Sequence, residues 1–265
     1  MMIPFHSALI SAAMCSVSLA AVRSGKAEAD WISTSGTCEA GKPLQTAVRL
    51  ALDEGWHTYW KNPGEGGMEI SVKWELPEGW KAGELEQPVP KRFMTGGLPG
   101  FGYEGSVIFP VAFTPPAGFS GEAKLRGKIS WLTCNDDSCV PGNADLELSL
   151  SAGPPAPTQD AATIAAALEK IPQPRENGAA LTVEEKPKTL LLAITGIELA
   201  ENSEIFPATP QVVDAAADFK FSKAGDRWTA EVPKNEYATG PAKELTLVLA
   251  GKGGTAPVSL TWKAK

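Results

Sequence analysis

The sequence is short of histidine, cysteine and positive charge, and each shortage excludes a class of function. Its 265 residues include two histidines and four cysteines, and 31 acidic against 24 basic side chains give a formal net charge of −7. Nucleic acids and anionic membranes need clustered Lys and Arg, and the sequence has no basic stripe. It also lacks histidines at metal-binding spacing, a Ser-His-Asp arrangement, clustered carboxylates and a phosphate-binding glycine loop. The cysteines remain as the candidate chemistry.

Long apolar runs are also scarce. Ala8–Val22 is an apolar run of about the length found in signal peptides, and Ala27–Ala29 (Ala-Glu-Ala) is a small-x-small cleavage site. We therefore expect residues 1–29 to be a signal peptide that is cleaved near Ala29. No later segment approaches the ~20 apolar residues of a membrane span, so the mature protein is expected to be soluble and not membrane-spanning. Export would place it where disulfides can form.

Residues 30–152 contain short segments in which apolar and polar residues alternate. In one of them, the apolar face consists of Met68, Ile70, Val72, Trp74 and Leu76. A period of two is the pattern of a half-buried β-strand. The same pattern recurs, between turn signals rich in proline, glycine and asparagine, at Leu44–Leu52, Val107–Phe113, Leu125–Trp131 and Leu146–Leu150. Short strands at this spacing predict an antiparallel β-sandwich.

A proline-rich linker is predicted to follow, over residues 153–177. It begins with the sequence Gly-Pro-Pro-Ala-Pro, and apolar residues then recur at helical spacing. This pattern predicts one short helix over residues 158–171, with Thr158 as the candidate N-cap. The apolar positions of this helix are Ile164, Leu168 and Ile171.

Residues 178–265 return to the alternating pattern and predict a second, smaller β-sandwich. The expected strands lie around Leu190–Ile194, Phe219–Phe221, Trp228–Val232, Leu245–Leu249 and Val258–Trp262. The two halves are not obvious repeats of one another. The sequence thus predicts an all-β protein of two sandwich domains.

Cys134 and Cys139 are the candidate reactive pair. A strand pattern leads into Cys134, and the four residues between the cysteines, Asn135–Ser138, are strong turn formers. A hairpin with this loop would place the two cysteines opposite each other, with Cα atoms about 4.5–5.5 Å apart, where a disulfide can form. A helix would point them in different directions. We therefore expect the pair to face each other across a hairpin.

The residues alone leave the role of this pair open. A bridge across so short a loop restricts the unfolded chain by only about 2 kcal/mol, which favours a redox role over a structural one. Asp136 and Asp137 disfavour a thiolate, which favours a structural disulfide. A metal site or a pair of free thiols is the third possibility. Cys38 is the odd cysteine, and we expect it to be a buried or idle thiol or to bridge to another chain.

Three segments carry a family resemblance. They are Gly55–Gly64 (GWHTYWKNPG), Gly102–Val111, with its GYEG and FPV sequences, and Trp131–Gly142, which runs from WLTC to CVPG. Together they resemble the N-terminal periplasmic domain of the thiol:disulfide interchange protein DsbD and, more closely, the related ScsB-type proteins. The resemblance is close over residues 35–150 and fainter beyond. It implies that both sandwich domains are immunoglobulin-like.

The resemblance also implies a function. It predicts a periplasmic thiol-disulfide oxidoreductase or electron-relay protein, of the protein-disulfide reductase type, in which Cys134 and Cys139 cycle between dithiol and disulfide without a cofactor. The expected donor is a membrane-embedded electron-transfer protein, and the expected acceptors are thioredoxin-like periplasmic proteins. Because the sequence stops at Lys265, both would be separate proteins. The rival interpretation is a non-enzymatic binding or assembly module with a structural hairpin disulfide.

Five further candidate residues follow from the same resemblance. His57 and Tyr59 match positions near the cysteines, where a histidine could handle protons and a tyrosine hydroxyl could hydrogen-bond a leaving thiolate. The alternative for His57 is a half-exposed strand residue. Residues 92–103 are rich in glycine and are predicted to form a loop. In the family this segment is a cap loop whose aromatic residue covers the cysteines, and the candidates are Phe93, Phe101 and Tyr103; the alternative is an ordinary connecting loop.

Overall fold

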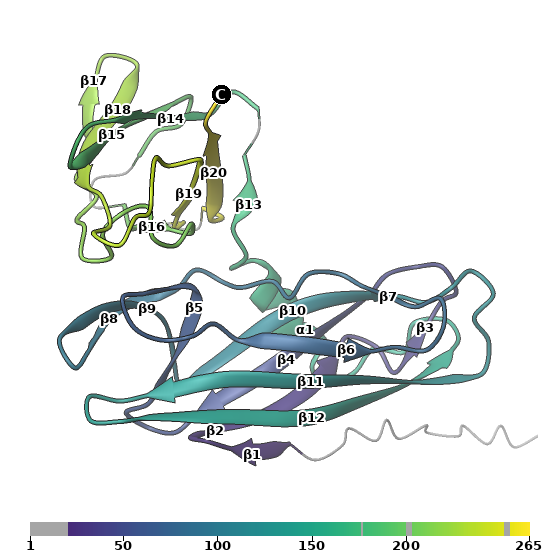
Figure 1. Cartoon of the computed structure of the whole chain (residues 1–265). Coiled ribbons are helices and arrows are strands. Elements are labelled where there is room, and N and C mark those ends of the chain that lie inside the picture. Colours follow the sequence, from purple (N-terminus) through teal and green to yellow (C-terminus); the bar gives the residue numbers. More distant parts are fainter. Residues whose placement is uncertain (1–20, 176, 200–202, 252–254) are drawn as a thin grey trace, which may run out of the picture.

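The computed structural model describes residues 21–175, 177–199, 203–251 and 255–265. The first domain is a sandwich of two sheets (Figure 1). One sheet contains, in order, β1 (Val22–Ser24), β2 (Ala27–Ser33), β4 (Leu44–Leu52), β10 (Ser106–Thr114) and β7 (Lys81–Ala82). The other contains β3 (Thr37–Cys38), β12 (Cys139–Ala152), β11 (Glu122–Cys134), β5 (His57–Gly64), β9 (Leu98–Glu104) and β8 (Lys91–Thr95), with β6 (Ser71–Glu75) paired to β11.

The second domain is a smaller sandwich that lies above the β5, β8 and β9 end of the first (Figure 1). One of its sheets contains β13 (Gln173–Pro174), β20 (Val258–Lys263), β19 (Glu244–Leu249) and β16 (Ile205–Pro207). The other contains β14 (Ala180–Glu185), β15 (Thr189–Thr195), β18 (Arg227–Pro233) and β17 (Ser222–Ala224). The predicted fold class, all-β with two immunoglobulin-like sandwiches and a short linker helix, is confirmed.

Alternating strands supply the core of the first domain. Phe109 and Phe113 of β10, Leu125 and Trp131 of β11 and Trp60 of β5 are all completely buried. Each side chain of this kind contributes about 1.5–3 kcal/mol when it is removed from water. The apolar face that the sequence predicted for residues 107–113 is therefore the face of β10 that packs in the core between the two sheets.

The longest pairing in the molecule is the antiparallel hairpin of β11 and β12. All 13 residues of β11 have a partner in β12, from Glu122 opposite Ser151 to Cys134 opposite Cys139. Near its tip, Trp131 lies opposite Gly142, and a Cβ atom at Gly142 would lie 2.4 Å from the indole ring. Gly142 therefore allows the tryptophan to pack flat across the hairpin.

The linker helix α1 (Ala161–Leu168) is shorter than the predicted range of 158–171. Its N-cap residue is Asp160, so the prediction of Thr158 is wrong. The physical reason is that the first α-helical hydrogen bond runs from the Ile164 N–H to the Asp160 carbonyl, at 3.0 Å, while the Thr158 hydroxyl accepts from the Asp160 backbone N–H, at 3.2 Å, in the turn before the helix. Residues 158–160 therefore form a turn that precedes the helix. Ile171 is buried beyond the end of the helix.

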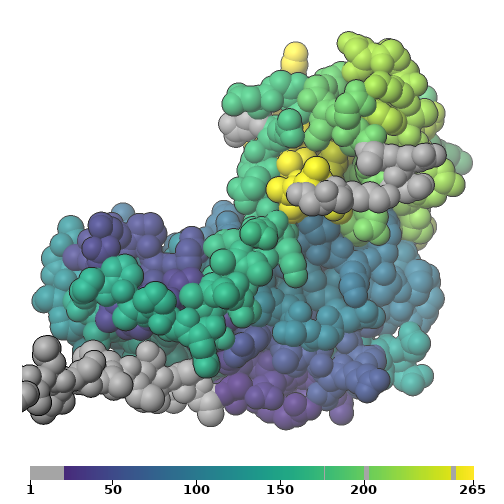
Figure 2. Space-filling model, turned by 180° about the vertical axis from the view of Figure 1, so that it is seen from behind, coloured from purple at the N-terminus to yellow at the C-terminus, as the bar shows by residue number. Residues whose placement is uncertain are grey.

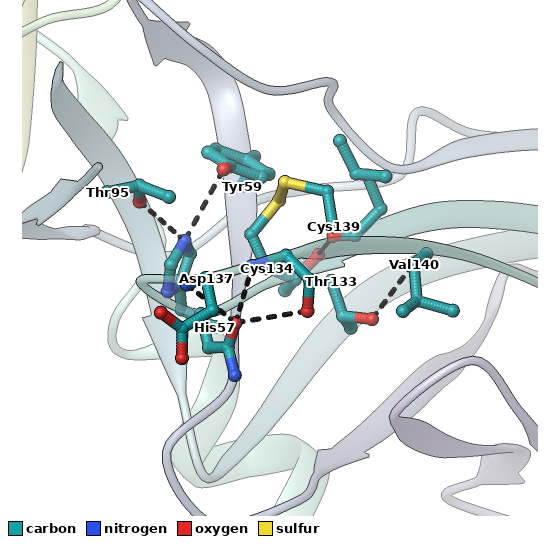
Figure 3. The surroundings of a disulfide bond; sticks show 12 residues. His57, Tyr59, Thr95, Thr133, Cys134, Asp137, Cys139 and Val140 are labelled. Atoms are coloured by element: carbon teal, nitrogen blue, oxygen red, sulfur yellow. Dashed lines mark hydrogen bonds between the residues drawn. A yellow bond between two sulfur atoms is a disulfide. The ribbon is translucent and has the colours of Figure 1, made fainter.

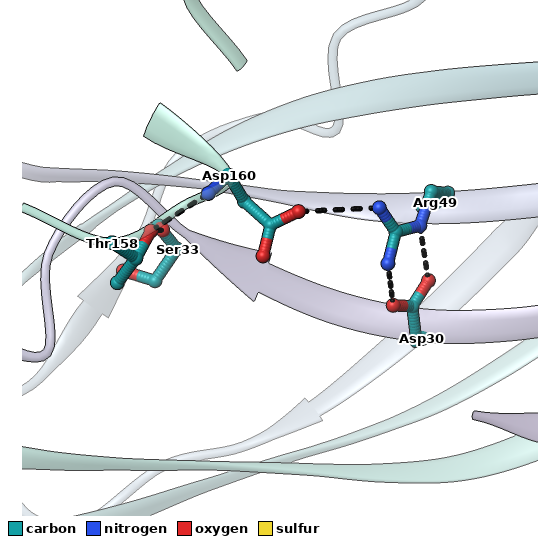
Figure 4. A network of polar contacts seen from close by, with 5 residues as sticks. All are labelled: Asp30, Ser33, Arg49, Thr158 and Asp160. Carbon is teal, nitrogen blue, oxygen red and sulfur yellow. Dashed lines mark hydrogen bonds and ion pairs between the residues drawn. The ribbon is translucent and has the colours of Figure 1, made fainter. Parts of the chain in front are cut away.

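Apolar and ionic contacts hold α1 on the first domain (Figure 4). Ile164 of the helix is completely buried in a small cluster with Ile32. The guanidinium of Arg49 lies between two carboxylates, where it pairs with Asp30 and donates to Asp160 at 3.2 Å. These contacts fix the start of the linker on the five-stranded sheet.

Two strand predictions are wrong in detail. The predicted strand at Phe219–Phe221 is absent, since β17 begins at Ser222, and Phe219 reaches the core of the second domain from a loop. The predicted strand over Met68–Leu76 is shortened to β6, which leaves Met68 outside it and 49% exposed. Phe219 thus makes its core contact without a strand, and Met68 makes its exposed face available without one.

The first strands begin before the predicted cleavage site. β1 pairs with the start of β2, and Ala27 and Ala29 are completely buried in the core. Ser24 also accepts a hydrogen bond from the backbone N–H of Asn143, at 3.0 Å. The boundary at Ala29 stays a prediction, and a cut there would remove β1 and the first residues of β2.

We predict that a protein beginning at Asp30 is less stable to urea than one beginning at Val22. Loss of the β1–β2 pairing and of two buried alanines should lower the free energy of unfolding by at least ~2 kcal/mol. Chemical denaturation followed by tryptophan fluorescence measures this difference. Equal midpoints and slopes for the two proteins would contradict it.

Candidate functional site

The cysteine pair lies at the tip of the β11–β12 hairpin. Cys134 and Cys139 are cross-strand partners joined by a disulfide, with Cα atoms 4.1 Å apart. Asn135 shapes the loop, because its side-chain oxygen accepts from the backbone N–H groups of Asp137 and Ser138, at 3.1 and 2.8 Å. The prediction that the two cysteines face each other across a hairpin is confirmed (Figure 3).

The two sulfur-bearing residues differ sharply in exposure. Cys134 is completely buried, whereas Cys139 is exposed. A thiolate from another molecule attacks a disulfide in line with the S–S bond, so it must reach one sulfur from solvent. The side of the bond that is open to such an attack is Cys139. The sequence could not make this distinction.

β5 brings His57 next to the buried cysteine. His57 is the cross-strand partner of Cys134, and Thr58 is the partner of Thr133. The Thr58 hydroxyl donates to the Leu132 carbonyl at 2.9 Å, which ties the strands together. His57 is 6% exposed, so the alternative of a half-exposed strand residue is wrong. Figure 3 shows His57 and Tyr59 beside the disulfide.

Thr95 completes this cluster, and the sequence did not indicate it. Its hydroxyl lies 2.9 Å from Nε2 of His57, and the hydroxyl of Tyr59 lies 3.4 Å from the same nitrogen. Thr95 ends β8, 38 residues along the chain from His57. A threonine in a glycine-rich segment gives no sequence signal of such a contact.

The segment predicted as a loop is a β-hairpin, so that prediction is wrong. β8 and β9 pair from Lys91–Gly102 to Thr95–Leu98, around Gly96 and Gly97. Both of these glycines have positive φ, 56° and 86°, which suits a tight two-residue turn. Glycine richness here serves a turn and close packing between strands. We call residues 91–104 the cap hairpin.

Of the three aromatic candidates for a cap, Phe93 alone lies at the site. Its ring centroid is 4.1 Å from that of His57 and 5.6 Å from that of Tyr59. Phe101 is instead completely buried, next to Trp60. The third candidate, at position 103, is also buried in the core.

Tyr103 is held in the core by two contacts. Its hydroxyl donates to the Pro88 carbonyl at 2.8 Å, and its ring packs edge-on against Phe109, with centroids 5.5 Å apart. It therefore anchors the β9 end of the cap hairpin in the core and does not face the disulfide.

Burial keeps the polar side chains of the site neutral. It lowers the pKa of His57 from its ordinary 6.5, and the opposing attraction to Glu104 and Asp136 is smaller. Burial also raises the pKa of the Tyr59 hydroxyl, against a smaller opposite effect of the hydrogen bond to Thr95. At neutral pH the disulfide therefore has an uncharged imidazole and an uncharged phenol beside it.

The remaining cysteine chemistry concerns metal binding and the third thiol. Within the described ranges, no group of three or more His, Cys, Asp or Glu side chains is arranged to hold a metal ion, and both sulfurs of the pair are in the disulfide. Cys38 is a free thiol, buried in the first core, and its burial raises its pKa. That placement fits the expected idle thiol, because a bridge to another chain requires access.

We predict that acid loosens the cap hairpin. Because burial lowers the pKa of His57, the neutral ring stabilises the closed site fully above its ordinary pKa of 6.5. This stabilisation is lost as the pH falls through the lowered value, where the ring becomes a buried imidazolium whose two nitrogens both donate. An NMR titration of the His57 ring should give a pKa below 6.5 in the oxidised protein.

Thr95→Val is the variant to compare in this titration, since it keeps the shape of the side chain and removes the hydroxyl. We expect it to move the pKa of His57, while the exposed variant Thr182→Val leaves it unchanged. A His57 pKa at or above 6.5 in the unmodified protein would contradict the assignment of a buried, neutral ring.

The chain was compared with protein families and solved structures. Residues 29–151 match the family described as the thiol:disulfide interchange protein DsbD, N-terminal. The N-terminal periplasmic domain of ScsB from Proteus mirabilis has the same fold: the TM-score is 0.66 at 21% sequence identity, over 90% of this chain and 93% of that one. A search among curated proteins found no match. The resemblance seen in the sequence is confirmed: residues 29–151 match the DsbD N-terminal family, and the chain has the fold of the ScsB domain.

Proposed function

We propose that the protein is a periplasmic thiol-disulfide exchange protein in which Cys134 and Cys139 carry a pair of electrons between partner proteins. The observation that carries the proposal is the asymmetric disulfide: an exposed Cys139 bonded to a buried Cys134 at a hairpin tip. The domain belongs to a thiol-disulfide exchange family. Exchange requires that a partner thiolate reach the bond from solvent, and the exposed Cys139 provides that access.

The exchange proceeds in two balanced steps. A thiolate of a reduced donor attacks the sulfur of Cys139; a donor–Cys139 bond forms, the Cys134–Cys139 bond breaks, and Cys134 leaves as a thiolate that takes up a proton. The second thiol of the donor then attacks its own sulfur in this mixed disulfide and releases Cys139. The donor has become a disulfide, and this protein has gained two electrons and two protons. The reverse steps reduce an acceptor.

His57 and Tyr59 serve the buried sulfur in this scheme. Cys134 is the cross-strand partner of His57, whose ring nitrogen is in turn within hydrogen-bonding range of the Tyr59 hydroxyl. A neutral imidazole can accept a proton or a hydrogen bond, and a phenol can donate a hydrogen bond to a thiolate. Both would stabilise the leaving Cys134 without placing a fixed charge next to it.

An apolar rim (Met68, Met94 and Leu98) favours a protein as the partner. These three side chains are 49%, 56% and 47% exposed, and they belong to the loop over Tyr59 and to the cap hairpin. The Glu65 backbone N–H donates to the Pro99 carbonyl at 3.1 Å, which joins the two segments. Exposed apolar side chains on the segments that carry Phe93 and cover Tyr59 are typical of a transient protein interface.

The partners that we propose are a membrane-embedded electron-transfer protein as donor and thioredoxin-like periplasmic proteins as acceptors. Over the part of the chain that the structure describes, no helix has the length and apolar character needed to cross a bilayer. The apolar run at residues 8–22 would export the chain. Donor and acceptor would then both meet the same exposed Cys139.

The reduction potential of the Cys134–Cys139 couple tests this proposal. We expect equilibration with glutathione or dithiothreitol, followed by alkylation and mass spectrometry, to give a potential above about −300 mV, within reach of thioredoxin-like partners. A Cys38→Ala background keeps the third thiol out of the measurement. A value well below about −300 mV would identify an inert bond and would favour the rival, a binding module with a structural disulfide.

A further inference from the structure

Strand β8 presents two neighbouring residues to two different parts of the molecule. Side chains alternate between the faces of a strand, so Arg92 and Phe93 point in opposite directions. Phe93 packs on His57, beside the disulfide. Arg92 reaches the second domain. The space-filling view shows the two domains packed against each other (Figure 2).

The guanidinium of Arg92 holds two separate segments of the second domain. It donates to the backbone carbonyl of Ile205 in β16 at 2.8 Å and to that of Ala215, in the following loop, at 3.2 Å. A planar guanidinium can serve both carbonyls at once, and hydrogen bonds from a charged donor are stronger than neutral ones. These bonds join residues more than a hundred positions apart in the sequence.

Aromatic rings from both domains surround the same guanidinium. Its central carbon lies 5.0 Å from the ring centroid of Phe101 in β9, 5.3 Å from that of Phe206 and 5.9 Å from that of Phe219. The residue as a whole stays exposed because it lines an open cavity of about 750 Å³. Burial of the charged group lowers the pKa of Arg92, while Asp218 and Glu204 oppose that effect.

A second tie joins β16 to the strand that carries His57. The amide nitrogen of Asn62, in β5, donates to the Pro207 carbonyl at 2.7 Å, and its oxygen accepts from the Gly64 backbone N–H at 3.2 Å. β16 therefore contacts both β5 and β8. These are the strands that supply the two halves of the cluster beside the disulfide.

We propose that Arg92 is a positioning residue, through which the second domain holds β8 so that Phe93 and Thr95 rest on His57 and Tyr59. This inference rests on the proposed function, and it gives the second domain a role in it. Without the bonds from Arg92, β8 loses its anchor on the second domain and moves away from β5 more readily. Phe93 and Thr95 then leave His57 and Tyr59 more often, and the buried Cys134 side of the disulfide becomes reachable in addition to the exposed Cys139.

Arg92→Ala tests the proposal with two readouts. The NMR resonance of the His57 ring should lose part of the ring-current shift that Phe93 causes. Reduction of the disulfide by dithiothreitol, a small reagent that needs no docking surface, should become at least about fivefold faster, since loss of even one net hydrogen bond changes a two-state population by that factor. Arg92→Lys keeps the charge with a single point donor, so both effects should be partly restored.

Arg126→Ala is the matched control, because Arg126 is an exposed strand arginine paired with Glu147 and not with the second domain. It should change neither readout. An unshifted His57 resonance and an unchanged reduction rate in folded Arg92→Ala would overturn the proposal. If circular dichroism shows that Arg92→Ala does not fold, the same two readouts are taken on Arg92→Lys, and an unshifted His57 resonance with an unchanged reduction rate overturns the proposal.

The same experiment separates this proposal from the proposed function. A shifted His57 resonance and faster reduction by dithiothreitol support the role of Arg92 even where no thioredoxin-like protein exchanges electrons with the disulfide. That combination would reject the function alone. If Arg92→Ala and Arg126→Ala exchange with such a protein at equal rates and the His57 resonance is unshifted in both, only the role of Arg92 is rejected.

Discussion

The pairing of β11 with β12 fixes where both sulfurs lie, because its last residue pair is Cys134 and Cys139. A slip of one residue in this register would turn every side chain of β12 to the opposite face and separate the cysteines. The register is secured far from the site, by apolar residues such as Leu125 and Leu150 that share the core. The disulfide is therefore formed by a hairpin that other contacts already align.

Burial then makes the two ends of that bond different. β5 pairs alongside β11 and places His57 next to Cys134, and the cap hairpin closes over His57 from the other side. Cys139 stays exposed. In the proposed exchange, one sulfur would be available to a partner, while the other would leave into a site whose imidazole and phenol are kept neutral by burial. The second domain extends the same arrangement through its contacts with β8 and β5.

Local sequence patterns predicted much of this and missed what depends on distant contacts. The strand at Leu44–Leu52 and the hairpin at Asn135–Ser138 follow from alternation and from turn residues, which are local signals. The cap hairpin was mistaken for a loop because glycine also permits tight turns and close strand packing: a Cβ atom at Gly100 would lie 2.7 Å from the ring of Phe93.

The roles of Thr95 and Arg92 had no local signal at all. Thr95 contacts His57 across 38 residues of sequence, and Arg92 contacts Ile205 across 113. Such contacts follow from how sheets and domains pack, and the residue types alone are ordinary for an exposed strand. The difference in exposure between Cys139 and Cys134 also has no local signal, because it depends on β5 lying beside Cys134.

The central claim is that Cys139 is the sulfur that partners reach, and single-cysteine trapping tests it most directly. In a Cys38→Ala background, Cys134→Ser leaves Cys139 and Cys139→Ser leaves Cys134. Each is mixed with a thioredoxin-like protein whose active-site thiol is activated as a mixed disulfide with thionitrobenzoate, and release of that group is followed by absorbance. We predict much faster formation of the protein–protein disulfide by Cys134→Ser. Equal rates, or faster reaction of Cys139→Ser, would contradict the account.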